Sequence, residues 1–394
     1  MLPLTLSACT AASALGVGKA ATLAALRAGR SGLRPYADRG LATWAGRVDG
    51  LEEVRLPAGL EGFDCRNNRL AALGLAADGF AGAARAAAGR WGPERVAVVL
   101  GTSTSGIASA EDAYRRRDPA TGRLPADFDY RRTQDLQALA VFVRAALGLR
   151  GPASVLSTAC TSAAKAFGEA AELMAAGLCD AAVVGGVDSM CDMTLYGFNA
   201  LELVSAGPCR PFDAERDGIS IGEAAAFALL ERPAAGSAGR IGLLGFGASA
   251  DAHHMSTPHP EGRGAAAAMT AALASAGIGP DTVDYVNFHG TGTRANDAAE
   301  DRAVWEVLGD RPHCSSTKGW TGHALGTAGA LEAVIAALCI ERGLVPGCLG
   351  TRTPDPACRC RILLDNAERP VRYVLSNSFG FGGSNCSLLL GVLP

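Results

Sequence analysis

Short apolar runs alternate along this chain with longer alanine-rich stretches. The runs end at glycine or polar clusters, as at 95–100, 181–184 and 283–288. The stretches between such runs are long enough for helices, which we place at roughly 70–89, 161–176, 264–276, 297–308 and 327–342. Strands and helices in alternation are typical of βαβ units. The sequence therefore predicts an α/β fold whose mostly parallel sheet is covered by helices on both faces.

The chain also divides into two halves with a similar pattern. Breakers at Pro208, Pro211, Pro233 and Gly236 punctuate the middle, and a strand at 241–245 opens a second series of strands and helices. The segments 163–174 and 328–338 are both small-residue helices, and such helices can lie close together in a buried layer. We expect an N-terminal half at 1–238 and a C-terminal half at 239–394.

Charge argues against a nucleic-acid partner. The formal net charge is −3 over 394 residues, and the basic clusters at 115–117 and 131–132 are short. Such clusters are typical of a solvated face, and the alternative is that they receive an acidic protein or a phosphate.

Twelve cysteines are scattered through the chain rather than regularly spaced, which indicates buried thiols instead of a disulfide framework. Cys358 and Cys360, with Cys348 upstream, lack the paired spacing of a structural zinc site. Free thiols fit a reducing compartment, so we expect the protein in the cytoplasm.

The N-terminus contains a sequence that resembles a lipoprotein cleavage box, Leu-Ser-Ala-Cys at 6–9. It lacks a charged region and an adequate apolar stretch before it, so we interpret 2–7 as a first strand that leads to a turn at Gly16 and Gly18. No stretch approaches the ~20 continuous apolar residues that span a bilayer. We expect no membrane insertion.

Cys160 is the candidate nucleophile. It stands in Ser-Thr-Ala-Cys-Thr-Ser-Ala at 157–163, after an apolar run and directly before a helix that can begin at Thr161 or Ser162. Unpaired N–H groups and the helix dipole at that position favour a thiolate. The alternative, a buried structural cysteine, is the usual fate of a lone thiol.

Two further segments supply histidines in glycine-rich surroundings. His289 opens the turn Gly-Thr-Gly-Thr at 290–293, and His323 lies in the loop 319–326 ahead of a helix, five positions after Lys318. A lone histidine after a strand is usually a hydrogen-bonded core residue. The three segments together instead predict a Cys-His-His acyl-transfer site.

With Asn-Ser-Phe-Gly-Phe-Gly-Gly-Ser at 377–384, these motifs resemble those of the elongating β-ketoacyl-[acyl-carrier-protein] synthases over nearly the whole chain. The resemblance implies a thiolase-like fold, in which two similar halves stack as five alternating layers. It places the nucleophile in the first half and both histidines in the second. It also implies a homodimer, in which the neighbouring subunit contributes to the pocket wall; a heterodimer with a ketosynthase-like partner is the other possibility.

The resemblance also assigns roles to individual residues. Cys160 corresponds to the acyl nucleophile, His289 and His323 to the pair that promotes decarboxylation of a malonyl thioester, and Lys318 and Glu332 to the lysine and the acidic residue beside them. Phe381 corresponds to a gating phenylalanine whose N–H completes an oxyanion hole with that of Cys160. The predicted substrate-binding residues are Thr291, Thr293, Phe379 and Thr104.

The implied reaction is a decarboxylative Claisen condensation that extends an acyl chain by two carbons. Both substrates arrive on the phosphopantetheine arm of acyl carrier protein, the expected partner. The chemistry needs a thiolate, an oxyanion hole of backbone donors and two neutral imidazoles in a site shielded from water. We expect no metal and no redox cofactor.

Several departures leave the acyl chain open. Ala163 and Lys165 stand where many fatty-acid enzymes have Gly and His, and Gly-Thr-Ser-Thr-Ser-Gly at 101–106 replaces a more glycine-rich loop. The segment 36–50 resembles members from bacterial aryl-polyene clusters, so the pathway is either primary fatty-acid or specialised polyene synthesis. The histidines of 251–259 could suggest a metal cluster, but this segment resembles an ordinary loop of the family.

Three other functions compete with this interpretation. A thiolase would carry a second cysteine in its C-terminal glycine motif, whereas Cys386 follows that motif. A non-catalytic partner that sets chain length for a true synthase typically lacks the nucleophile, which is present here as Cys160. A pure scaffold would have no need of two histidine loops and a thiol.

Overall fold

The computed structural model describes residues 1–394, and its main sheet has the strand order β11-β10-β14-β15-β9-β1-β8-β7-β5-β6. The first half contributes five of these strands: β1 (Leu4–Ser13), β5 (Val96–Gly101), β6 (Ala153–Leu156), β7 (Ala181–Asp188) and β8 (Ala224–Glu231). The second half contributes β9 (Ile241–Ala250), β10 (Tyr285–Asn287), β11 (His313–Ser315), β14 (Tyr373–Gly380) and β15 (Ser384–Val392).

The two halves repeat one topology. If the five strands of each half are numbered along the chain, both halves read third, second, fourth, fifth, first across the sheet. The outer pairings are parallel in both, and the inner pairings are antiparallel in both. The halves join where β1 pairs with β9, antiparallel, at Leu4 and Leu243. The chain is therefore a duplicated α/β fold.

The expectation of a mostly parallel sheet is wrong. The main path has four parallel and five antiparallel pairings, so the sheet is mixed. Strand direction was predicted wrongly because burial hides it. Every residue of β7 and β8 is buried, and a fully buried strand has an apolar sequence whether it runs parallel or antiparallel to its neighbours.

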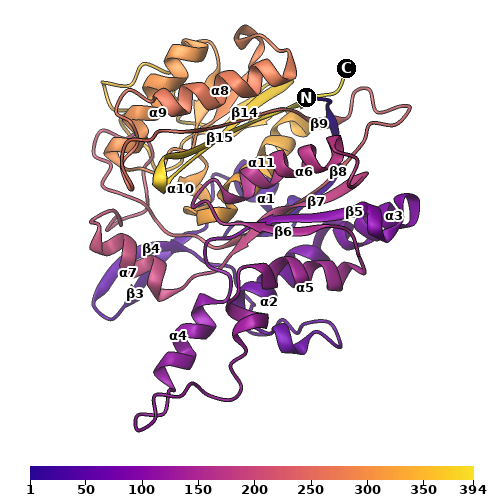
Figure 1. Ribbon diagram of the computed structural model, residues 1–394. Coiled ribbons are helices and arrows are strands. Elements are labelled where there is room, and N and C mark those ends of the chain that lie inside the picture. The colour runs from indigo at the N-terminus through magenta and orange to yellow at the C-terminus, as the bar shows by residue number, and fades with distance from the viewer.

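Helices and sheet form five layers (Figure 1). The long helices α6 (Ser162–Ala175) and α11 (Ala328–Arg342) lie in the middle layer, between the two halves of the sheet. One outer layer holds α2 (Arg66–Ala76), α3 (Phe80–Trp91) and α5 (Gln137–Leu147), and the other holds α8 (Arg263–Ala276) and α9 (Arg294–Leu308). The thiolase-like, five-layered fold implied by the sequence resemblance is confirmed.

Small residues allow the middle layer to pack closely. A Cβ added to Gly329 on α11 would lie 2.7 Å from the Cβ of Ala164 on α6. Real Cβ atoms do not approach so closely. The two helices can therefore pack at this distance only because residue 329 is a glycine. The largest apolar cluster, of 41 buried residues, includes this layer and the inner faces of the strands.

Most of the predicted elements are present, with two changes. The single helix expected at 70–89 is two helices, because Asp78 and Gly79 adopt positive φ angles of 53° and 70° between α2 and α3. The first strand extends well beyond 2–7, to Ser13, and turns back at β2 (Gly16–Val17).

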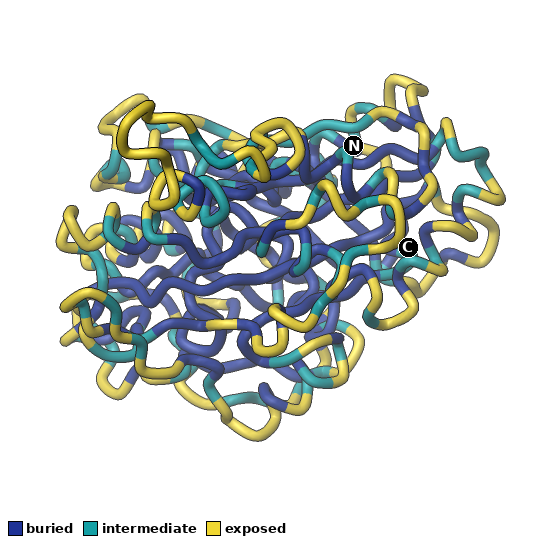
Figure 2. Tube along the Cα trace, turned by 90° about the horizontal axis from the view of Figure 1, so that it is seen from below, coloured by how far each residue is buried: buried dark blue, intermediate teal, exposed yellow.

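The remaining helices and strands lie outside the main path of the sheet and the long layer helices. They are α1 (Lys19–Arg27), β3 (Leu33–Asp38), β4 (Leu41–Gly46), α4 (Ile107–Arg115), α7 (Asp192–Ala200), α10 (Lys318–Thr321), β12 (Leu344–Val345) and β13 (Ala367–Glu368). Figure 2 shows that buried residues fill the middle of the molecule and that exposed residues gather at its periphery.

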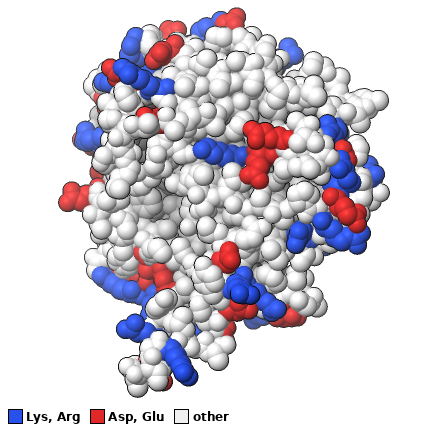
Figure 3. All heavy atoms as spheres, in the orientation of Figure 1, with Lys and Arg blue, Asp and Glu red and all other residues white.

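The surface carries both signs of charge. Figure 3 shows lysine and arginine side chains interspersed with acidic ones around a broad uncharged area. In the basic cluster at 115–117, Arg115 pairs with Asp192, and Arg116 pairs with Asp112 and Asp127. No helix combines the length and apolar character needed to cross a membrane. All twelve cysteines are unpaired thiols, and only Cys358 is not buried.

Candidate active site

The nucleophile segment is a tight turn between β6 and α6. Ala159 has a φ of 54°, which is unusual for a residue with a Cβ, and the turn places Cys160 two residues before the first residue of α6. The strand end at Gly380 packs directly against it: an added Cβ would lie 3.1 Å from the Cys160 nitrogen and 3.3 Å from the Thr158 oxygen. The expected position at a helix N-terminus is confirmed.

His289 follows β10, and a residue that the sequence analysis missed holds its backbone. The Glu300 carboxylate on α9 accepts hydrogen bonds from the N–H of His289 at 2.8 Å and of Gly290 at 2.7 Å. Burial raises the pKa of Glu300 to about 8, although these N–H donors oppose the rise. Glu300 lies on the buried face of α9 together with two other acidic residues, Asp297 and Asp301.

His323 lies between α10 and α11, in a loop that Asp188 anchors. The buried Asp188 carboxylate accepts from the N–H and hydroxyl of Thr327 at 2.8 and 3.1 Å. Its other oxygen accepts from Ser103 and Thr104 N–H groups, both at 2.7 Å. Asp188 thus ties the loops of the two halves together, and the sequence analysis did not identify it.

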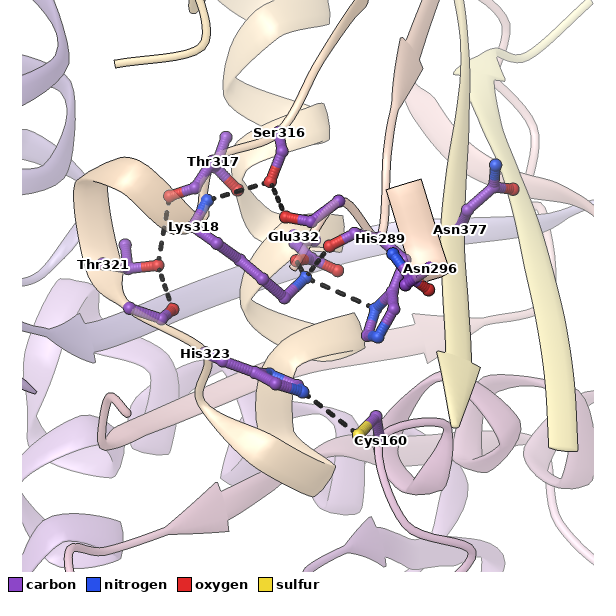
Figure 4. A network of polar contacts seen from close by, with 12 residues as sticks. Cys160, His289, Asn296, Ser316, Thr317, Lys318, Thr321, His323, Glu332 and Asn377 are labelled. Carbon is purple, nitrogen blue, oxygen red and sulfur yellow. Dashed lines mark hydrogen bonds and ion pairs between the residues drawn. The ribbon is translucent and has the colours of Figure 1, made fainter. Parts of the chain in front are cut away.

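The three reactive side chains meet at one point (Figure 4). The Sγ atom of Cys160 is 3.1 Å from Nε2 of His323, and the ring centroids of His289 and His323 are 5.2 Å apart, nearly perpendicular. One donor atom from each of the three residues lies within 4.8 Å of the others. All three side chains are buried.

Lys318 supports His289 from behind. Its Nζ donates to Oε1 of Glu332 at 2.6 Å, to the His289 carbonyl, and to Nδ1 of His289 at 3.4 Å. These three contacts use all three ammonium hydrogens. Because a lysine only donates, Nδ1 of His289 is the acceptor, and the neutral ring carries its proton on Nε2.

Burial sets the protonation states of the site. It lowers the pKa of both His289 and His323 well below the usual value, and the Lys318 charge lowers them further. Burial also raises the pKa of Cys160 to about 11, a shift that Lys318 and the N–H of Phe381 oppose. The resting pair is therefore a neutral thiol beside a neutral imidazole. The sequence analysis predicted a thiolate at rest; the structure instead favours a thiol that contacts His323.

Glu332 is a buried acidic residue that pairs with Lys318. Burial raises its pKa to about 7, and the ion pair with Lys318 opposes the rise. Its second oxygen, Oε2, has no hydrogen-bond partner. Glu332 therefore holds Lys318 without reaching the reactive thiol.

A cavity of about 430 Å³ opens onto the three reactive side chains. The predicted substrate-binding residues Thr291, Thr293 and Phe379 line it, and so does Phe381, whose ring lies 5.4 Å from that of Phe198 on α7. Phe198 was not predicted. Lys318 and Glu332 are buried behind His289 and do not line the cavity.

One predicted residue lies elsewhere. The Thr104 hydroxyl donates to Asp188 at 2.8 Å, and the residue is fully buried outside the cavity. This side chain therefore does not contact a substrate held in the cavity, because the loop anchor occupies its one polar group. Cys386, the other cysteine near the C-terminal motif, is buried within β15 and also lies outside the cavity.

The histidines of 251–259 lie on a loop at the surface. The rings of His253 and His259 have centroids 5.1 Å apart, and no third His, Cys or acidic side chain completes a group of donors around them. Cys358 and Cys360 likewise belong to no such group.

The sequence of this chain matches a known protein family. The chain matches the family models for the β-ketoacyl synthase N-terminal domain at residues 76–235 and C-terminal domain at residues 242–352. It is 38% identical to the 3-oxoacyl-[acyl-carrier-protein] synthase 2 of Rhizobium meliloti over 323 residues, 76% of each chain.

Two solved structures share the whole fold. The first is a ketosynthase in complex with its chain length factor from Xenorhabdus doucetiae, with 38% identity, a TM-score of 0.89, and coverage of 99% of this chain and 98% of that one. The second is the ishigamide ketosynthase/chain length factor, with 28% identity, a TM-score of 0.88 and full coverage of both chains. This chain belongs to the β-ketoacyl synthase family of condensing acyltransferases.

Proposed function

We propose that the protein is an elongating 3-oxoacyl-[acyl-carrier-protein] synthase. It takes an acyl group onto Cys160, decarboxylates malonyl-carrier protein and joins the two, extending the chain by two carbons. The observation that carries this proposal is the contact of 3.1 Å between the Cys160 thiol and His323, with a second neutral imidazole beside them in one cavity.

The first half-reaction moves the acyl group from the carrier thioester to Cys160. His323 Nε2 takes the thiol proton as the sulfur attacks, so a free thiolate is not needed in the resting site. The N–H groups of Cys160 and Phe381 stabilise the oxyanion. The bond between the acyl carbon and the carrier sulfur then breaks, and the carrier thiolate takes up the proton.

The second half-reaction forms the carbon–carbon bond. The malonyl thioester loses carbon dioxide, and the electron pair of that bond passes into an enolate whose oxygen accepts an N–H bond from Nε2 of His289. His323 donates to the same oxygen in the tautomer that carries the ring proton on Nε2, which no longer faces a thiol once Cys160 is acylated. The enolate carbon attacks the acyl carbon on Cys160, and the bond to Cys160 sulfur breaks. Uptake of one proton restores the thiol. Lys318 keeps the Nε2–H of His289 directed toward the enolate.

The substrates enter on a flexible arm. Thr291 and Thr293, whose hydroxyls lie 3.0 Å apart on the cavity wall, suit the amides of phosphopantetheine. This arm belongs to the carrier protein, so we propose that the enzyme needs no metal and no cofactor of its own. We further propose that it works in the cytoplasm, where twelve free thiols stay reduced.

The solved relatives bear on which subunit pairs with this chain. Both solved relatives described above come from structures of a ketosynthase with a chain length factor. We propose that this chain is a catalytic subunit, because Cys160, His289 and His323 come together at one cavity. A non-catalytic chain-length subunit would have no use for this arrangement. We also propose that this chain forms a homodimer, as the sequence resemblance implies.

The proposal is tested by intact-mass measurement of the protein after incubation with acyl-carrier proteins of several chain types, saturated and polyene. We expect an acyl adduct on wild type and none on Cys160→Ala, and the preferred donor identifies the pathway. Absence of an adduct with every donor contradicts the catalytic role and favours the chain-length subunit.

A further inference from the structure

Lys165 forms a second lysine contact at the active site. It lies on α6, about one turn after Cys160, and its Nζ donates to the Ser384 hydroxyl at 2.7 Å. No carboxylate lies within ion-pair distance of it. The proposed mechanism makes no use of this cation.

The chain uses lysine sparingly. Of 36 basic Lys and Arg residues only three are lysines: Lys19, Lys165 and Lys318. Two of the three therefore lie beside the nucleophile or its histidine. A lysine offers a compact ammonium that fits where the broad guanidinium of arginine does not.

Hydrogen bonds connect Lys165 to the nucleophile turn in one direction. The Thr161 hydroxyl donates its single hydrogen to the Thr158 carbonyl at 2.7 Å, so at its 2.9 Å contact with Ser384 it must accept. The Ser384 hydroxyl therefore donates to Thr161 and accepts from Lys165. The Lys165 side chain thus begins a polarised chain that ends at the carbonyl of Thr158.

Ser384 also holds the other side of the oxyanion hole. It pairs with Gly380 across the short turn 381–383 that carries Phe381, so its position determines where both ends of that turn lie. The two N–H donors of the hole come from Cys160, in the nucleophile turn, and from Phe381. The Lys165-Ser384-Thr161 chain spans these two segments.

We propose that Lys165 is a positioning residue for acyl transfer, which fixes the spacing of the two oxyanion N–H donors through Ser384 and Thr161. This inference rests on the proposed function. Lys165 contacts neither substrate nor the reacting atoms. The decarboxylation half-reaction uses the imidazoles of the other half of the chain and does not depend on the hydrogen bonds from Lys165 through Ser384 to Thr161.

The test compares the two half-reactions in Lys165→Met, with Lys19→Met as the matched control. Acylation of Cys160 is followed by intact mass in a quenched-flow series, and malonyl-carrier decarboxylation is followed in a Cys160→Ala background. Removing one oxyanion donor outright slows catalysis about 100-fold or more, so a misplaced pair of donors predicts a loss of about tenfold in the acylation rate. Decarboxylation stays within about twofold of its parent, and Lys19→Met acylates at the wild-type rate.

Further variants and a thiol probe separate positioning from general damage. Ser384→Ala reproduces the acylation defect, and Lys165→Arg restores part of it only if the ammonium charge matters more than its compact shape. Alkylation of Cys160 by iodoacetamide, which needs no oxyanion hole, keeps its rate in Lys165→Met. Equal slowing of both half-reactions, or of alkylation, shows a merely structural role and overturns the proposal.

The outcomes also distinguish this inference from the proposed function. If wild type and Lys165→Met acylate equally fast, only the positioning role of Lys165 is overturned. Wild type that does not acylate with any donor contradicts the proposed function itself.

Discussion

At the scale of single residues, the active site depends on the buried Lys318, which lowers the pKa of each titratable group beside it. Lys318 lowers the pKa of both histidines, and it also lowers that of Glu332, which burial raises. The neutral state of His323 is what allows it to accept the thiol proton. The lysine thus keeps the base in its working form.

Removing this charge shifts the pH dependence of acylation. Acylation requires neutral His323, so it is lost as the pH falls through the His323 pKa, which lies well below 6.5 in the wild type. Lys318→Met raises that pKa, and the acid limb of the rate profile moves to higher pH. Since a buried partner left unpaired costs about 3–5 kcal/mol, the measurement is made in Lys318→Met with Glu332→Gln. An acid limb that does not move contradicts the assignment of His323 as the base.

Glu300 makes stability depend on pH. Its pKa is about 8 in the folded protein against an ordinary 4.5, so between these values the folded state holds a proton that the unfolded chain releases. The free energy of unfolding therefore falls as the pH rises across this window, by up to about 1.4 kcal/mol per pH unit. Glu300→Gln removes this slope. Urea unfolding at pH 5, 6 and 7 measures it, and parallel curves for the two proteins contradict the raised pKa.

At the scale of elements, the middle layer has no room for an added side chain where α6 and α11 meet. A Cβ at Gly329 would lie 2.7 Å from both the Ala164 Cβ and the Ser378 hydroxyl, whereas one at Gly82 on α3 meets nothing within 4 Å. Helix propensity favours alanine at both positions, so only the packing differs.

This contrast gives a matched pair of variants. Gly329→Ala lowers the free energy of unfolding by about 1–3 kcal/mol through overpacking between α6 and α11. Gly82→Ala raises it by about 0.5–1 kcal/mol, since alanine is the better helix former. Chemical denaturation measures both, and equal effects would contradict the close helix contact.

Element type was more predictable than element direction or division. The helices α6, α8, α9 and α11 lie close to their predicted ranges because they are long and alanine-rich. Strand direction could not be predicted, because strands such as β7 and β8 are buried on both faces and have no polar side to orient them. The break between α2 and α3 had a local signal in Asp78-Gly79, a common turn pair.

The candidate site was predictable where it has local motifs. Cys160, His289 and His323 each stand in a distinctive segment, whereas Glu300 and Asp188 act on loops from elements distant in the sequence. Their partners are backbone N–H groups and hydroxyls, which leave no mark in the sequence. Burial of Cys160, which keeps it a thiol at rest, likewise follows only from the assembled layers.

At the scale of the whole molecule, duplication places the nucleophile and its histidines face to face. Helices α6 and α11 occupy equivalent places in the two halves and follow the third strand of each. Cys160 precedes the first and His323 precedes the second. The site therefore forms where the two repeats meet, and each half alone has only part of it.

The oligomeric state is a prediction at this scale. Strand β6 lies at one end of the main sheet, with all four residues only partly buried and one edge unpaired. We expect light scattering to give twice the 40.1 kDa chain mass for the purified protein. A monomer at micromolar concentration contradicts the homodimer, and a dimer that forms only with a second kind of chain supports the pairing seen in the relatives.

The measurement that tests the central claim most directly is product analysis with the purified chain, an acyl-carrier protein and malonyl-carrier protein labelled with carbon-13 at the methylene carbon. The account predicts a β-ketoacyl carrier that is two carbons longer, with one labelled carbon and one carbon dioxide released per product, and no product from Cys160→Ala. Carbon dioxide release without a longer chain, or a product from Cys160→Ala, would contradict condensation on this thiol.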